Sequence, residues 1–247
     1  MFDLIVHNSI MTMHSDRASV GSEVVAIMFS GGRDSSLATV TYCLRGYDVQ
    51  LLRFSTGFGI PSPLPGIREA ELRARFKNQL LPSVLMPVYG IVRAISSATI
   101  EEDFRRFNGK NLVLLGEKLA IHAASLTFCL ENQINILADG TSGYQAEMPE
   151  QRPVAIGFFR DLSTRYGIRY ETPIVEAGSE LDVKYALLEA GMSTKSLEGL
   201  SMFADSFTKA DDQTILAYLQ SKEHIACSYI ERFSSRQRRI GDGLANG

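Results

Sequence analysis

Short apolar runs alternate with longer amphipathic stretches from Val24 onward. The runs are rich in Val, Ile and Leu, and five of them have the length of strands: 24–29, 47–54, 84–88, 134–138 and 168–174. The spacing of apolar residues between them predicts helices over 35–45, 68–79, 100–107, 112–131, 154–166, 179–190 and 210–233. This alternation predicts an α/β fold, with an open, mostly parallel five-stranded sheet and helices on both faces.

The same pattern predicts the division of the chain. We expect an N-terminal edge segment over 1–22, one main domain over 23–206, a C-terminal helix over 207–235 and a flexible tail over 236–247. The segment 61–66 contains three prolines and predicts an irregular loop. In the helix that follows, Arg and Glu alternate, which is typical of a solvated face.

The first predicted strand runs directly into Ser30, Gly31 and Gly32, and a predicted helix follows. Glycine adopts backbone angles that other residues resist, and it lets an anion approach the main-chain amides. The start of the helix adds unpaired amides and the positive end of its dipole. Ser30 and Ser35 can donate hydrogen bonds to phosphate oxygens, whereas Arg33 either adds a phosphate contact or is solvated. The stretch therefore predicts a phosphate site.

The spacing excludes two other glycine motifs, because it lacks both the Gly-Lys-Ser/Thr of the Walker loop and the three glycines of the dinucleotide fingerprint. Asp34 would repel a bound triphosphate unless a cation lay between them. Magnesium is the expected cation. The alternative for Asp34 is an ordinary helix cap.

The residues Ser30-Gly31-Gly32-Arg33-Asp34-Ser35 resemble the signature of the PP-loop ATP pyrophosphatases. The resemblance implies an adenine nucleotide alpha-hydrolase-like, Rossmann-like fold with ATP as cofactor. In that family the loop grips the leaving pyrophosphate while a substrate oxygen attacks the α-phosphorus. We expect the adenine near Phe54 and Ser55, where the second strand ends.

Further residues resemble the branch that contains 7-cyano-7-deazaguanine synthase, from about Val24 to Phe203. Ser142, Gly143 and Tyr144 match a substrate loop, with Arg152 at its close, and Lys184 matches a lysine on the helix before the final loop. Each has a plainer interpretation: an ordinary turn with Tyr144 covering the core, Arg152 capping a helix or pairing with Glu150, and Lys184 as one more exposed lysine.

The chain departs from that branch at the zinc site. The synthases carry four cysteines near the C-terminus, whereas this chain has three in all, Cys43, Cys129 and Cys227, and Ser201 stands near the first ligand position. A tetrahedral zinc needs four such ligands, so we expect no zinc site. The chain resembles instead the zinc-free relatives found in natural-product or defence gene sets.

The resemblance implies a carbon–nitrogen ligase. A carboxylate substrate, a 7-deazaguanine-type acid, would be adenylated with release of pyrophosphate and converted to an amide or nitrile, or joined to a small amine or a partner polypeptide. Asp34, Lys184 and Arg152 would be the catalytic residues, and Tyr144 could stack on a planar ring. The alternatives are a tRNA-modifying enzyme of thiolation or lysidine type and a non-catalytic ATP-binding subunit. Thiolation needs a thiolate, yet Cys43 and Cys129 fall in apolar helices.

The composition of the chain bears on its binding partners and its compartment. The 247 residues are 45% hydrophobic, with a net charge of −3, so no global basic field would attract nucleic acid. No signal peptide is visible and no uninterrupted apolar run approaches 18 residues, which predicts a cytoplasmic protein away from membranes. The odd, scattered cysteines agree with a reducing compartment. A homodimer could form through the C-terminal helix.

Overall fold

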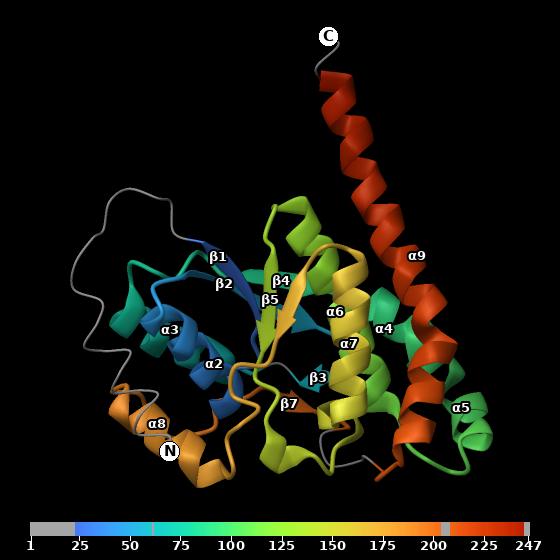
Figure 1. The fold of residues 1–247 in the computed structure, drawn as a ribbon, viewed down its shortest axis with the longest axis horizontal. Helices are drawn as coiled ribbons and strands as arrows, with labels where there is room; N and C mark the ends of the chain where they lie inside the picture. Colours follow the sequence, from blue (N-terminus) through green and yellow to red (C-terminus); the bar gives the residue numbers. More distant parts are fainter. Residues whose placement is uncertain (1–22, 61, 204–207, 245–247) are drawn as a thin grey trace.

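A parallel sheet organises the computed structural model, which describes residues 23–60, 62–203 and 208–244 (Figure 1). Its five strands lie in the order β4-β2-β1-β5-β6, and every neighbouring pair is parallel. The predicted fold class is confirmed, and the predicted edge segment 1–22 lies outside the described residues. The strands are β1 (Val24–Met28), β2 (Asp48–Ser55), β4 (Val84–Pro87), β5 (Ile136–Asp139) and β6 (Arg169–Glu171).

Helices cover both faces of the sheet and form two separate cores (Figure 1). Successive residues of β1 point to opposite faces, so that Val25 and Ile27 enter one core and Ala26 and Met28 the other. The first core contains residues of α2 (Arg33–Leu44), α3 (Leu64–Phe76) and α8 (Glu180–Glu189). The second contains residues of α4 (Tyr89–Ile95), α6 (Val113–Glu131), α7 (Pro153–Arg165) and α9 (Asp212–Leu244).

Helix α6 is the central element of the second core. By length and composition it could cross a membrane, but 67% of its most apolar window is buried inside the domain, as expected of a core helix. Its Gly116 allows a close approach of α9, because a Cβ there would lie 2.9 Å from the Cβ of Ser96 and would meet the Tyr218 hydroxyl. The apolar pattern of this helix therefore reflects packing within the domain.

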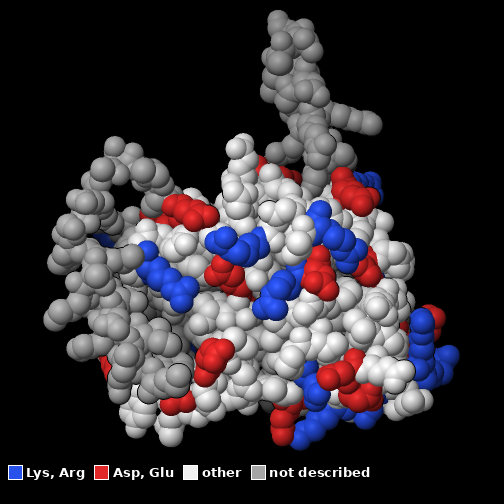
Figure 2. Space-filling view, viewed as in Figure 1, with Lys and Arg blue, Asp and Glu red and all other residues white. Residues whose placement is uncertain are grey.

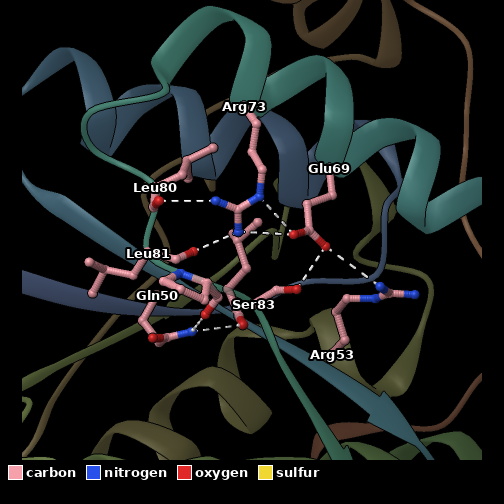
Figure 3. Close-up of polar contacts among 9 residues, drawn as sticks. Gln50, Arg53, Glu69, Arg73, Leu80, Leu81 and Ser83 are labelled. Atoms are coloured by element: carbon pink, nitrogen blue, oxygen red, sulfur yellow. Dashed lines mark hydrogen bonds and ion pairs between the residues drawn. The ribbon is translucent and has the colours of Figure 1, made fainter.

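Helix α3 corrects two predictions. It begins at Leu64, within the segment expected to be an irregular loop, and its charged side chains are not a solvated face. Arg73 donates to the carbonyl oxygens of Leu80 and Leu81 at 3.0 and 2.7 Å, and Glu69 accepts from Ser83 Oγ at 2.8 Å (Figure 3). These contacts fasten α3 to the loop before β4. Alternation of charges could not distinguish the solvated positions from the bonded ones.

Several shorter elements were not predicted. A small antiparallel sheet joins β3 (Gly59–Ile60) to β7 (Leu200–Ser201) below the carboxyl ends of the main strands (Figure 1). Helix α4 precedes η1 (Ser97–Thr99) and the predicted helix α5 (Ile100–Arg106), and η2 (Gly143–Gln145) and η3 (Pro149–Gln151) interrupt the loop after β5. The tail expected to be flexible over 236–247 is helical as far as Leu244, and the end of α9 projects beyond the sheet layers (Figure 1).

The charge on the visible face is mixed. Lys and Arg side chains lie among Asp and Glu side chains in Figure 2, and the described part of this face presents no single basic patch.

Candidate functional site

The site begins where β1 ends. Gly31 adopts a φ of +86°, which glycine accepts without strain, and Gly32 is the N-cap residue of α2. The amide of Ser36 donates to the carbonyl oxygen of Gly32 at 3.1 Å, so the helical bonding starts there. The first amides of a helix have no acceptor within it and carry the positive end of the dipole. The loop thus has the backbone of an anion site.

Hydroxyl groups line this loop. Ser30 Oγ accepts a hydrogen bond from the Gly32 amide at 3.1 Å and lies 3.2 Å from Ser35 Oγ, and the Ser35 hydroxyl also donates to the carbonyl oxygen of Gly32. Ser30 is exposed and Ser35 is buried. The two predicted serines therefore lie together at the mouth of the loop, where either hydroxyl could turn toward a bound anion.

The two glycines serve different purposes. A Cβ on Gly31 would lie 2.7 Å from both Pro65 Cα and the carbonyl oxygen of Leu197, so this glycine is required by its φ and by packing. A Cβ on Gly32 would instead lie 3.2 Å from a carboxylate oxygen of Glu198. An acidic group therefore lies against the loop, and sequence reasoning did not predict it.

Asp34 lies in the first turn of α2 without capping it. Instead its two carboxylate oxygens accept from the Tyr144 hydroxyl, at 2.8 and 3.0 Å. Burial raises the pKa of Asp34 to about 6, the Tyr144 hydrogen bond opposes the shift, and the Glu198 carboxylate adds to it. Tyr144 thus contacts a predicted site residue instead of only covering the core. Asp34 is partly buried, and the nearby Arg33 guanidinium only partly offsets the rise of its pKa, so this carboxylate is suited to receive a further cation.

Two basic side chains meet on one carboxylate beside the loop. Arg33 Nη2 and Lys184 Nζ lie 2.5 and 3.1 Å from Glu180 Oε1 at the start of α8. Arg33 and Lys184 were predicted separately, from the loop and from a helix 150 residues later, and the fold brings them together. Because the Glu180 side chain is 45% exposed, an incoming anion could compete with it for both cations.

The tip of β5 completes the site. A Cβ on Gly140 would lie 2.6 Å from the carbonyl carbon of Asp34, so the chain after β5 contacts the start of α2 directly. The chain passes from β1 outward through β2 and β4 and returns to β5 on the other side of β1. Ligands of open α/β sheets bind at such a switch point, outside the carboxyl ends of the strands. The loop from Ser30 to Ser35 is at that position.

Asp139, the last residue of β5, is locked by its neighbours. It is ion-paired with Lys118 of α6, and it accepts from the Tyr170 hydroxyl at 2.8 Å and from the Thr141 amide at 3.0 Å. Burial alone would raise the pKa of Asp139, but Lys118 and these hydrogen bonds hold it below its ordinary value. An Asp-Gly pair after a buried run was the available signal, and it was missed.

Two more acidic side chains lie on the α6 side. Burial raises the pKa of Glu117, although a hydrogen bond with Thr56 opposes the shift, and burial also raises the pKa of Glu150. Oε2 of Glu150 is buried without a hydrogen-bond partner among the described residues. Neither was predicted as a site residue.

The remaining predicted residues are more dispersed. Ser55 is exposed at the end of β2, and Phe54 packs at the edge of the second core. The amide of Gly143 donates to the carbonyl oxygen of Val175 at 3.1 Å, and the amide of Ser142 to Gln151 Oε1 at 3.0 Å, which holds the loop after β5 in place. Arg152 is the N-cap residue of α7, and its Nη2 lies 2.9 Å from Asp212 Oδ1 on α9. It pairs with Asp212 and not with Glu150.

Two of the three cysteines, Cys43 and Cys129, are buried in the protein core. Cys43 and Cys129 are 1% and 0% exposed, and burial raises the pKa of each thiol to about 12. Cys227 is partly exposed on α9. Within residues 23–60, 62–203 and 208–244, no three His, Cys, Asp or Glu side chains gather as a metal site. Asp34 could still contribute one carboxylate to magnesium, which in nucleotide sites takes most of its ligands from phosphates and water.

The comparisons with known proteins give only distant likenesses. No family model matches the chain, and no curated protein matches it. Among solved structures the chain is similar to a predicted subunit of a tRNA methyltransferase from Methanocaldococcus jannaschii, with a TM-score of 0.42, 22% identity and coverage of 69% of this chain and 90% of that one.

Two further structures cover nearly the whole chain. The U34-tRNA thiolase NcsA from Methanococcus maripaludis gives a TM-score of 0.47 at 12% identity and covers 97% of this chain and 79% of its own. The second structure covers 96% of this chain. NMN synthetase from Francisella tularensis gives 0.47 at 15% identity, over 92% of its own chain. All three TM-scores are below 0.5. The likenesses therefore carry no argument about activity, which has to rest on the residues of the site.

Proposed function

We propose that the chain is an ATP-dependent enzyme that transfers AMP to a carboxylate substrate and releases pyrophosphate. One observation carries the proposal: at the switch point of the sheet, the loop Ser30 to Ser35 joins a buried strand to a helix start and presents amides, hydroxyls and the Asp34 carboxylate together. This is the arrangement that holds the outer phosphates of a nucleotide.

The chemistry divides into two steps. A carboxylate oxygen of the substrate attacks the α-phosphorus of ATP, the bond to the bridging oxygen breaks, and pyrophosphate leaves with that oxygen. Magnesium bound at Asp34 would supply positive charge for the departing group. An amine nitrogen then attacks the carbonyl carbon, AMP leaves, and a proton passes to solvent, which gives an amide. Fixed donors aimed at developing charge are the usual main source of such rate enhancement.

The other predicted residues have supporting roles. Arg33 and Lys184, at the rim of the loop, can neutralise the phosphate or the substrate carboxylate once they leave Glu180. Tyr144 keeps Asp34 oriented through its hydroxyl. The 7-deazaguanine-type acid remains the first candidate substrate through the sequence resemblance. We place the reaction in the cytoplasm, in agreement with the free thiols.

The burial of two cysteines disfavours thiolation. A thiolate nucleophile must be exposed and have a pKa near or below neutrality, whereas burial raises the pKa of Cys43 and Cys129 to about 12. A serine at each cysteine position should therefore leave turnover unchanged.

The decisive test is the identity of the products. Purified protein is incubated with ATP labelled at the α-phosphate, magnesium, an ammonium salt and a panel of carboxylic acids that includes a 7-deazaguanine acid. We expect labelled AMP and unlabelled pyrophosphate, dependent on the acid, with Asp34→Asn as the inactive control. Labelled ADP would reject the proposal.

A further inference from the structure

A strap formed by residues 193–199 crosses the phosphate loop. One end is fixed by Arg68, whose side chain is 0% exposed and donates to the carbonyl oxygens of Ser193, at 2.9 Å, and Lys195. Glu71 accepts from the Ser193 amide and lies 2.6 Å from Arg68 Nη1. A buried guanidinium needs such partners, so this end of the strap is firmly held.

The other end of the strap is held by a small sheet. Strand β7 follows directly and pairs with β3, and the amide of Met202 donates to the carbonyl oxygen of Phe58 at 3.0 Å. The rings of Phe58 and Phe203 pack edge to face with centroids 4.8 Å apart. Both ends are therefore fixed, and the stretch between them has to pass over the loop.

The middle of the strap supplies a carboxylate. The carbonyl oxygen of Leu197 closes over Gly31, and Glu198 Oε2 lies 3.2 Å from the Cβ position of Gly32. This is the side of Gly32 that has no side chain. A carboxylate and a phosphate share charge and acceptor oxygens, so Glu198 has the chemistry expected of a ligand at this position.

Within residues 23–60, 62–203 and 208–244, no ion pair stabilises the contact of Glu198 with the loop. The Glu198 carboxylate is close enough to Asp34 for its charge to raise the pKa of that residue. Glu198 is also exposed, so it can turn into water without breaking a buried bond. The anchors of the strap, and not attraction of the carboxylate, hold it over the loop. Such a contact is easily displaced.

From these observations we infer that Glu198 is an internal stand-in for a phosphate group, and that the strap closes the loop until ATP displaces it. The inference rests on the proposed function, since it supposes that the loop binds the outer phosphates. It adds regulation of that site: nucleotide binding must overcome the placement of Glu198, and release of pyrophosphate is followed by its return.

Calorimetry of wild-type protein and Glu198→Gln tests the inference, with pyrophosphate in the absence of magnesium and with ATP and magnesium. Removing one negative charge that competes with the ligand should tighten both affinities about tenfold. Glu198→Asp retains the charge and should stay within about threefold of wild type. The matched control is Glu189→Gln, which removes an exposed carboxylate at the end of α8 and should change nothing.

The outcomes separate the two proposals. If wild-type protein binds both ligands and Glu198→Gln binds them equally, the stand-in is overturned while the proposed function survives. If Glu198→Gln binds ATP more weakly only when magnesium is present, Glu198 assists a cation, which also overturns the stand-in. If no variant binds either ligand, both proposals fail. Hydrogen exchange at residues 193–199 gives an independent reading: it should speed up when pyrophosphate is added to wild-type protein, and no change would contradict displacement.

Discussion

Two aspartates at neighbouring strand tips have opposite surroundings. Asp139, at the end of β5, is 2% exposed and is satisfied by Lys118, Tyr170 and a backbone amide. Asp34, in the helix start after β1, is partly buried, accepts from the Tyr144 hydroxyl and lies near both the Glu198 carboxylate and the Arg33 guanidinium. Surroundings lower the pKa of Asp139 and raise that of Asp34 to about 6.

The different surroundings of the two aspartates indicate different roles, a structural one for Asp139 and a binding one for Asp34. A paired buried carboxylate is costly to disturb and holds backbone in place, whereas a partly buried carboxylate with a raised pKa is destabilising in its charged form and is typical of places where a ligand supplies the charge. Asp139 positions the turn that contains Gly140, and this turn contacts Asp34. Asp139 thus helps to position Asp34, the aspartate that we propose binds magnesium.

Replacing the carboxylate of Asp34 tests the functional side of the comparison most strongly. Asp34→Asn preserves shape and an acceptor for Tyr144 but loses the charge that would hold magnesium. We expect turnover, measured as pyrophosphate release, to fall about 1,000-fold or more. A variant with more than a tenth of wild-type turnover would show that Asp34 is not part of the chemistry.

Removing the cation that pairs with Asp139 should lower the stability of the protein and not its turnover. Lys118→Met leaves Asp139 buried without its cation, which should lower the free energy of unfolding by about 3 to 4 kcal/mol in a urea titration. The matched control is Lys209→Met, because Lys209 pairs with Glu147 at the surface, where about 0 to 1 kcal/mol is expected. Equal losses in the two variants would mean that the Asp139 pair is not a structural lock.

Pushing the turn after β5 away from the start of α2 should lower both the stability of the protein and its affinity for ATP. In Gly140→Ala the added Cβ would lie 2.6 Å from the carbonyl carbon of Asp34, so the start of α2 or the turn must move. We expect a loss of about 2 to 3 kcal/mol in stability and about tenfold in ATP affinity. Gly157→Ala, on α7 with no atom within 4 Å of its Cβ, is the control and should be neutral or slightly stabilising. Unchanged ATP affinity in Gly140→Ala would remove β5 from the site.

The pH dependence of stability distinguishes the two aspartates by sign. Because the folded pKa of Asp34 is about 6 and its ordinary value is 3.8, the folded state holds the proton more tightly, and Asp34 costs stability as pH rises from about 4 to 6. Asp139, with a lowered pKa, stabilises above its ordinary pKa and loses that contribution as the solution is acidified.

Comparison of wild-type protein with Asp34→Asn isolates the contribution of Asp34 to the pH dependence of stability. Thermal unfolding of wild type and Asp34→Asn from pH 4 to 7 should show the variant gaining about 1 to 2 kcal/mol over wild type, after allowance for solvent screening. His122 contributes equally to both proteins, since burial lowers its pKa to about 3 and it destabilises only under acid conditions. A constant difference across this range would mean that Asp34 is not raised.

The sequence predicted what local pattern controls. Five apolar runs determined the parallel sheet, and the loop from Ser30 to Ser35 was recognised because strand, glycines and helix start are contiguous. Tyr144 contacts Asp34, so two segments that were predicted separately lie together, although the sequence did not predict this contact.

Long-range placement accounts for the features that were missed. Glu198 reaches Gly32 across more than 160 residues, and the buried Arg68 is satisfied by carbonyl oxygens of the strap as well as by Glu71. In the alternating Arg and Glu pattern of α3, no local property distinguishes the buried Arg68 from the other charged residues. The locked Asp139 likewise depends on Lys118 of α6 and Tyr170 of β6.

A crystal structure with a non-hydrolysable ATP analogue, bridged by carbon between the α- and β-phosphorus, tests the central claim most directly. The account predicts β- and γ-phosphate oxygens within hydrogen-bond distance of the Gly32 and Ser35 amides, with Glu198 turned away from Gly32. It would be contradicted by nucleotide bound elsewhere while Glu198 stays over the loop.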